Sequence, residues 1–215
     1  MKKQEIAISV NDLHVYYRDM NRFSLKKGGL KSRGSGKIFK AVKGVTFEVP
    51  KGQILGICGK NGSGKSTLLR AISGIFSADK GSINLHGNSI SLLSIGVGFQ
   101  KQLTGYENIF LSGMLLGYSK EQIEEKVKDI IEFSELGDFI YKPVRSYSSG
   151  MYSKLAFSIT AILETDIMLI DEVLSVGDIH FKEKSYNKMK ELISDDKRTV
   201  VIVSHNSKTI IELCD

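Results

Sequence analysis

The hydrophobic and polar positions of this 215-residue chain change their period along its length, and each period predicts a different element. Residues 6–10 and 45–49 alternate between apolar and polar side chains, which predicts two half-buried β-strands. Two later segments, 167–170 and 200–203, are continuous apolar runs. Such runs are typical of parallel strands that are buried on both faces.

The middle of the chain follows a helical period instead. From Glu107 to about Leu163 apolar residues recur at helical spacing. Within this block a capping box begins at Ser119. The apolar residues that follow it on one helix face are Ile123, Val127, Ile130 and Ile131. Because strands alternate with helices on both sides of the block, the pattern predicts an α/β core with an antiparallel β edge and an α-helical subdomain.

Positive charge is concentrated in one segment. The net charge is +6, but residues 18–43 contain nine Lys or Arg against one acid, Asp19, so the rest of the chain carries −2. A basic surface spread over the fold, as expected for nucleic-acid binding, is therefore not indicated. An insertion at about 20–38 is rich in Gly, Ser and Lys. It is either a solvated loop or a contact for anionic headgroups or a membrane partner.

No apolar run approaches the roughly 20 residues that a membrane-spanning helix needs. Polar residues such as Glu5 and Asp12 also interrupt the N-terminal segment, so it does not fit a signal peptide. We expect a cytoplasmic protein that reaches the membrane only through a partner.

A glycine-rich segment between a predicted strand and a predicted helix carries the strongest chemical signal. The strand, residues 53–58, ends at Cys58, which is expected in the core. The segment fits the phosphate-loop pattern G-x-x-x-x-G-K-[ST]. It reads Gly59-Lys60-Asn61-Gly62-Ser63-Gly64-Lys65-Ser66. Backbone N–H groups of such a loop surround phosphate oxygens, Lys65 supplies an ammonium group, and the Ser66 hydroxyl is placed to ligate Mg²⁺.

Two acidic residues, Asp171 and Glu172, directly follow the apolar run 167–170. A purely structural strand seldom ends in two acids. Asp171 suits the coordination of Mg²⁺, and Glu172 suits the polarisation of an attacking water as general base. Together with the phosphate loop, the pair predicts a P-loop ATPase.

Further segments resemble, in their order along the chain, the motifs of the ABC ATPase family. The segment Y-S-S-G-M at 147–151 resembles the ABC signature, although that motif usually reads L-S-G-G-Q. The other matching segments are Gly98-Phe99-Gln100 (Q-loop), Ser175-Val176-Gly177-Asp178 (D-loop) and His205 (switch histidine). Gln102 is an alternative to Gln100, because the spacing after the Q-loop is compressed.

This resemblance implies a single nucleotide-binding domain over residues 1–215, with a RecA-like core, an antiparallel β subdomain and a helical subdomain at about 105–163. ATP would be bound by the phosphate loop with Thr67 and, from a second copy of the chain, by Ser148, Ser149 and Gly150. Tyr17 would stack on adenine, and Phe39 is its competitor for this role.

The resemblance also implies roles in catalysis. Glu172, His205 and Gln100 would be catalytic residues. The Mg²⁺ ligands would be Ser66, Gln100 and Asp171, and the D-loop residues Ser175 and Asp178 would lie at the dimer interface. ATP would close a head-to-tail pair of chains, and its hydrolysis would open the pair.

Longer patterns narrow the resemblance to one subfamily. G-x-G-F-x-x-x-L-T-G-x-E-N, Y-S-S-G-M and I-D-E-x-L-S-V-G-D together resemble exporters of teichoic acids and O-antigen-type polysaccharides. The implied partner is a transmembrane exporter subunit, and the implied location is the cytoplasmic face of the cell membrane.

Three other functions are weaker interpretations of the sequence. A soluble ABC-type ATPase acting on nucleic acid or ribosomes would usually bring fused ATPase domains or cysteine pairs. A GTPase would need an N-K-x-D motif to bind the guanine base, and the sequence has none. A non-catalytic ATP-binding regulator would not need the set Lys65, Asp171, Glu172 and His205. Because ABC ATPases generally continue beyond the switch histidine, we expect a partial chain, and a C-terminal carbohydrate-binding domain stays an open alternative.

Overall fold

Two β-sheets of different kinds frame the structure, a computed structural model that describes residues 4–18, 38–93, 96, 98–171, 178–195, 197–205 and 210. One sheet is antiparallel, with the order β2-β1-β4, and the other is parallel, with the order β3-β7-β6-β5. The antiparallel strands are β1 (Ile6–Arg18), β2 (Ile38–Pro50) and β4 (Lys80–Asn84). The parallel strands are β3 (Ile54–Cys58), β5 (Ile90–Leu93), β6 (Ile167–Asp171) and β7 (Thr199–Ser204).

The two central strands of the parallel sheet are buried on both faces, as their apolar runs predict. In β6, Leu169 belongs to one hydrophobic cluster and Met168 to another. In β7, Val201 and Val200 divide between the same two clusters. Successive side chains of a strand point to opposite faces, so an unbroken apolar run fills two cores at once.

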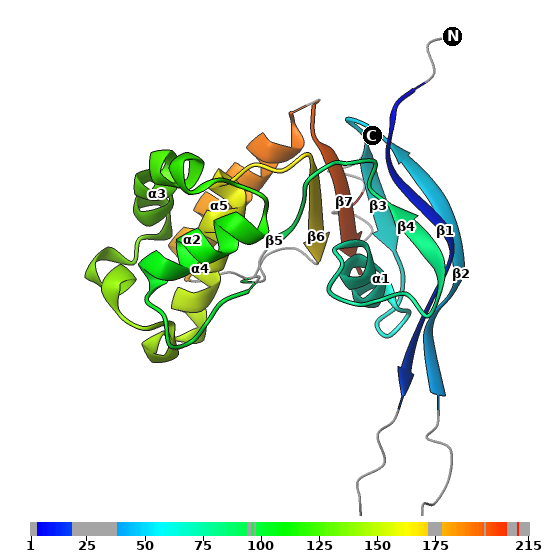
Figure 1. The fold of residues 1–215 in the computed structure, drawn as a ribbon, viewed down its shortest axis with the longest axis horizontal. Helices are drawn as coiled ribbons and strands as arrows, with labels where there is room; N and C mark the ends of the chain where they lie inside the picture. Colours follow the sequence, from blue (N-terminus) through cyan, green and yellow to red (C-terminus); the bar gives the residue numbers. More distant parts are fainter. Residues whose placement is uncertain are drawn as a thin grey trace, which may run out of the picture.

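Helices cover the two faces of the parallel sheet. Helix α1 (Lys65–Ile72) lies between the two sheets, because Leu69 and Ile72 share a cluster with residues of β1, β2, β6 and β7. Helices α4 (Ser149–Ile162) and α5 (Ile179–Ile193) cover the other face. In Figure 1 the antiparallel sheet and α1 lie on one side of β6 and β7, and α4 and α5 lie on the other.

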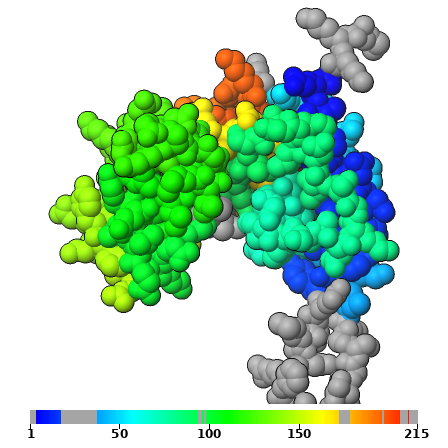
Figure 2. All heavy atoms as spheres, viewed as in Figure 1, coloured from blue at the N-terminus to red at the C-terminus, as the bar shows by residue number. Residues whose placement is uncertain are grey.

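A helical layer with its own hydrophobic cluster lies beyond α4. It contains α2 (Gly105–Leu115), α3 (Lys120–Ser134) and the 3₁₀ turns η1 (Gly137–Tyr141) and η2 (Val144–Ser146). The capping box at Ser119 is confirmed, and a second one at Thr104 starts α2. Figure 2 shows this layer as a green mass on one side of the molecule, with the blue and teal N-terminal part on the other.

The predicted fold class is confirmed, with an α/β core, an antiparallel sheet and a helical part. The boundary of the helical subdomain at about 105–163 stays a prediction. The predicted residues Glu172 and Ser175, and the basic insertion up to the start of β2, lie outside the described residues.

The prediction that Cys58 belongs to the core is wrong. Cys58 is exposed, at the carboxyl end of β3. The preceding side chains of β3 pack against both hydrophobic clusters, Ile54 against one and Leu55 and Ile57 against the other. Cys58 is the last residue of the strand, where the chain leaves the sheet for the glycine-rich loop. The run predicts the strand correctly, but not which of its residues the rest of the fold covers.

The start of α1 is tightly packed against β2. Gly64 has a φ of 96°, in the left-handed region, and caps the N-terminus of α1. A Cβ atom added at this residue would lie 2.3 Å from the carbonyl oxygen of Ala41 in β2. Only glycine combines this backbone conformation with so close an approach of another backbone. The last glycine of the phosphate-loop pattern therefore also sets how α1 sits on the antiparallel sheet.

Replacing Gly64 with alanine should lower the free energy of unfolding by about 3 kcal/mol, from left-handed strain of about 1–2 kcal/mol and a backbone clash of similar size. The matched control is Gly74→Ala, just beyond the other end of α1. Gly74 has a φ of 76° but nothing within 4 Å of an added Cβ. This control should lose only about 1 kcal/mol. Urea unfolding of both variants measures the difference, and equal losses would contradict the proposed packing role.

Candidate functional site

A polar cavity of about 190 Å³ opens where the phosphate-loop segment meets the carboxyl ends of β6 and β7. Since the strands are parallel, the loops that follow them gather at one edge of the sheet. The cavity brings together predicted residues from three distant parts of the chain. Its lining residues are Asn61, Gly62, Ser63, Lys65, Ser66, Asp171, Val203, Ser204 and His205.

The loop after β3 encloses the side chain of Lys65. The Lys65 ammonium donates hydrogen bonds to the carbonyl oxygens of Gly59 at 2.7 Å and Lys60 at 3.0 Å. The first turn of α1 contains no acidic residue, so the positive end of the helix is not offset by a carboxylate there. An ammonium group and a helix N-terminus at one cavity form an anion-binding arrangement, which suits phosphate oxygens.

Two oxygen groups face each other at the base of this cavity. The Ser66 hydroxyl donates a hydrogen bond of 2.9 Å to Oδ1 of Asp171, at the end of β6. A hydroxyl and a carboxylate are hard oxygen ligands of the kind that Mg²⁺ prefers, so this pair fits a magnesium site beside bound phosphates. His205 lines the same cavity directly after β7.

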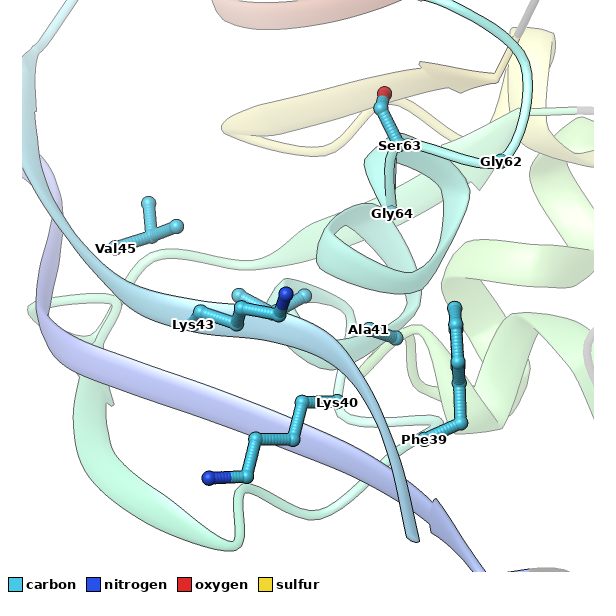
Figure 3. A pocket seen from close by; sticks show the side chains of 9 residues that line it. Phe39, Lys40, Ala41, Lys43, Val45, Gly62, Ser63 and Gly64 are labelled. Carbon is cyan, nitrogen blue, oxygen red and sulfur yellow. The ribbon is translucent and has the colours of Figure 1, made fainter. Parts of the chain in front are cut away.

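A second cavity, of about 440 Å³, lies on the other side of the loop, between Gly62–Gly64 and β2. Figure 3 shows Phe39 extending from β2 toward the side of Gly64, whereas the Lys40 side chain points away from it. Phe39 is 60% exposed, and it lines the cavity. An accessible aromatic ring beside a phosphate-binding loop can stack on a planar base.

Tyr17 lies directly opposite Phe39 in the β1–β2 ladder but lines neither described cavity. Its hydroxyl is 3.1 Å from that of Thr67 on α1, and its ring packs edge-on against Phe76. The predicted ATP-binding residues Tyr17 and Thr67 therefore contact each other.

Gln100 is held by a residue to which the sequence analysis assigned no role. The side-chain amide of Asn108, fully buried on α2, accepts from the Gln100 N–H at 2.7 Å and donates to the Gln100 carbonyl at 3.1 Å. It also donates to the carbonyl of Thr104 at 2.8 Å. Asn108 thus fixes the backbone at the predicted Q-loop. Neither Gln100 nor its alternative Gln102 is among the described residues that line the two cavities.

The predicted signature residues begin α4. The Ser148 side chain caps the helix by accepting from the Met151 N–H at 3.2 Å, and Ser149 is the first helical residue. Tyr147 anchors the segment, because its hydroxyl donates to the Phe139 carbonyl at 2.8 Å. Burial of this hydroxyl raises the pKa of Tyr147 to about 12. Ser148, Ser149 and Gly150 are not among the described residues that line the phosphate-loop cavities.

Backbone hydrogen bonds join the segment after Gln100 to the segment before the signature. The Arg145 N–H donates to the Lys101 carbonyl at 2.9 Å, and the Val144 N–H donates to the Leu103 carbonyl at 2.9 Å. In addition, the Phe99 ring packs edge-on against Tyr152 of α4 at a centroid distance of 4.9 Å. The predicted Q-loop and signature are therefore parts of one packed unit.

Asp178, the last predicted D-loop residue, caps α5 by accepting from the Phe181 N–H at 3.0 Å. It also pairs with Lys154 of α4 at 2.8 Å. The sequence analysis missed Lys154 and Asn108. Their signals were their positions, since Lys154 lies just after Y-S-S-G-M and Asn108 closes L-T-G-x-E-N.

Comparison with known sequences gives consistent matches over most of the chain. The sequence pattern of the ABC transporter family matches residues 42–175. An O-antigen export system ATP-binding protein of Klebsiella pneumoniae is 43% identical over 180 residues, which cover 84% of this chain and 73% of that protein. A teichoic acids export ATP-binding protein of Staphylococcus epidermidis is 40% identical over 210 residues, which cover 97% of this chain and 79% of that protein.

Other relatives are much longer than this chain. The match spans 43% of an O-antigen export system ATP-binding protein of Myxococcus xanthus and 32% of a teichoic acids export ATP-binding protein of Bacillus anthracis. Among solved structures, the ATP-binding subunit of an ABC transporter has the same fold, with a TM-score of 0.71 and 21% identity over 97% of this chain and 83% of that one. By its sequence matches the chain belongs to the ABC transporter family, as one of its ATP-binding cassettes.

Proposed function

We propose that this chain binds and hydrolyses ATP to drive an exporter of a cell-envelope polysaccharide, such as teichoic acid or O-antigen. One observation carries the catalytic part of the proposal. Lys65, the Ser66–Asp171 pair and His205 line a single cavity at the carboxyl edge of a parallel sheet. That arrangement supplies an ammonium group, hard oxygen ligands and an imidazole within one phosphate-sized space.

The residues present fit Mg²⁺ as the metal of this site. Ser66 and Asp171 would hold the ion, and Gln100 stays a predicted third ligand. When bound, Mg²⁺ neutralises charge on the β- and γ-phosphates. Lys65 would exchange its two carbonyl partners for phosphate oxygens.

The hydrolytic step needs a group that activates water. Glu172 follows Asp171, whose side chain faces Ser66, and we assign the role of general base to it. His205, across the cavity, would contact the γ-phosphate and orient the water.

Phe39 is the better candidate for stacking on adenine. Its exposed ring lines the larger cavity beside the phosphate loop, whereas the Tyr17 hydroxyl contacts Thr67 and its ring contacts Phe76. The adenine would then lie against β2, and the triphosphate would follow the loop toward Ser66.

A second copy of the chain would complete each ATP site. Ser148, Ser149 and Gly150 open α4 on the side of the helical layer, outside the described cavity linings. The N-terminus of α4 is suited to an anion. In a head-to-tail pair, it would meet the γ-phosphate held by the partner's loop, and Ser175 and Asp178 would lie at the interface.

The substrate and the membrane partner are proposed from the relatives. Several of them are named as ATP-binding proteins of O-antigen or teichoic acid export. In the described parts of the chain no helix is long and apolar enough to cross a membrane. On the pattern of these relatives we propose that a transmembrane subunit carries the glycan, with this chain at the cytoplasmic face. The alternative, a soluble ATPase acting on nucleic acid or ribosomes, has no such support.

Replacing Glu172 with glutamine should leave ATP binding within about twofold of the original but lower turnover at least 100-fold, because an amide cannot accept the proton of water. The matched control is Glu183→Gln, which changes an exposed acid on α5 and should keep full turnover. Phosphate release and nucleotide titration measure the two quantities. Full turnover in Glu172→Gln would contradict the assignment of the base.

Replacing Phe39 with alanine should weaken ATP binding by about 5- to 150-fold, since stacking on a base contributes about 1–3 kcal/mol. Binding of inorganic triphosphate should not change, because it has no base. Tyr17→Ala should alter ATP affinity less than threefold. Calorimetric titration with both ligands measures these effects, and the opposite ranking of the two variants would return the stacking role to Tyr17.

A further inference from the structure

Two lysines and two carboxylates form a compact cluster where α4, α5 and the end of α3 meet. Lys154 belongs to α4 and Lys184 to α5. Asp178 is the N-cap of α5, and Glu135 is the C-cap of α3. Each lysine also lies over an aromatic ring, Lys154 over Phe181 at 4.9 Å and Lys184 over Phe133 at 4.5 Å from the centroid.

Lys154 makes the contacts that link different elements. Its ammonium nitrogen lies 2.8 Å from Oδ2 of Asp178 and 3.5 Å from Oε2 of Glu135. Its side chain is only 14% exposed. An ammonium group so removed from water is retained in a fold only when it is paired, and it keeps more of its interaction than a fully exposed ion pair does.

Asp178 uses its two oxygens for different purposes. Oδ1 accepts the Phe181 N–H at 3.0 Å and so caps α5, while Oδ2 receives Lys154. The hydrogen bond from Lys154, followed by the one from Phe181, lowers the pKa of Asp178 from 3.8 to about 2. The carboxylate is therefore ionised throughout the physiological pH range.

The position of this ion pair suits a role beyond stability. Lys154 lies five residues after Ser149, the first residue of the helix that presents the predicted signature. Asp178 is the last residue of the predicted D-loop and the cap of the next helix. Both elements are assigned to the surface that meets a second copy of the chain, so their relative placement decides whether that copy can meet them together.

We propose that Lys154 is a positioning residue that ties the signature helix to the D-loop, so that the two elements face a second copy in one fixed arrangement. The inference rests on the proposed function, because it presupposes ATP-dependent pairing. It adds a residue that touches neither nucleotide nor metal and acts through Asp178. Loss of the pair should impair pairing of the chains while each chain still binds ATP.

The neighbouring ion pair offers a matched control. Lys184 lies 2.8 Å from Glu135 and donates to the Phe133 carbonyl at 3.1 Å. Like Lys154 it is a partly buried lysine over a phenylalanine ring, but it joins α5 to α3 and contacts neither the signature helix nor Asp178 through a described ion pair. The two lysines share Glu135, but Lys184→Met removes an ion pair of the same chemistry while leaving the Lys154–Asp178 pair in place.

The experiment measures ATP-dependent pairing of the chains by sedimentation in a Glu172→Gln background. ATP affinity is measured at protein concentrations too low for the chains to pair. Lys154→Met should weaken pairing at least tenfold and leave ATP affinity within twofold. Lys154→Arg should restore pairing to within threefold, and Lys184→Met should leave both quantities within twofold. In Lys154→Met, NMR titration should show the pKa of Asp178 rising from about 2 toward 3.8.

A double-mutant cycle separates the ion pair from the helix cap. Asp178→Asn keeps an oxygen that can cap α5, since asparagine is also a good N-cap, but it removes the charge. If the Lys154–Asp178 ion pair is the functional unit, the double variant Lys154→Met/Asp178→Asn should dimerise no more weakly than the weaker of the two single variants. Asp178→Asn alone also tests the proposal if Lys154→Met fails to fold.

Three outcomes would overturn the inference. The inference is wrong if Lys154→Met chains pair as strongly as the parent. It is also wrong if Lys184→Met weakens pairing as much as Lys154→Met does, because that would indicate a general structural effect. Fully additive losses in the cycle would show that Lys154 and Asp178 act separately. Failure of the Glu172→Gln parent to pair with ATP would instead refute the proposed two-copy function, so the two failures are distinguishable.

Discussion

The hydrogen bond of 2.9 Å between Ser66 and Asp171 joins two segments that lie 105 residues apart in the sequence. It forms because β3 and β6 both pair in parallel with β7, which places their carboxyl ends at one edge of the sheet. The phosphate loop, the proposed metal ligands and His205 all depend on this alignment. If the strands lost their register, the lysine and the carboxylate would remain in the sequence but would no longer share a cavity.

The motifs that predicted the site are local, and that is why they could be found. A phosphate loop needs a strand, a glycine-rich turn and a helix in succession, and the burial of β6 and β7 on both faces follows from uninterrupted apolar runs. The burial of Cys58 was predicted wrongly because what covers the end of a strand is a tertiary property. For the same reason the sequence left Tyr17 and Phe39 as alternatives. They lie opposite one another in a ladder, and only the surrounding structure shows that the Tyr17 hydroxyl meets Thr67 while the Phe39 ring lines a cavity.

The residues that the sequence did not reveal are those that connect one motif to another. Asn108 has no charge or periodicity to distinguish it, yet its buried amide holds the backbone of Gln100 from both sides. Lys154 resembles any polar residue on a helix, and only the fold shows Asp178 beside it. Backbone hydrogen bonds between 101–103 and 144–145 add a third connection. Thus the helical layer links the predicted Q-loop of one site to the signature that is proposed to serve the other.

The central claim is that each ATP is held by the loop of one copy and the signature of another, and mixing two defective variants tests it most directly. Lys65→Ala disables the loop. Ser149→Asp places a negative charge where the γ-phosphate would meet α4, although an aspartate at the first position of a helix favours the helix itself. With Glu172→Gln in both chains, neither variant should pair with ATP, but their mixture should, because each mixed pair contains one intact site. A mixture that stays monomeric under conditions in which the Glu172→Gln parent pairs would contradict the account.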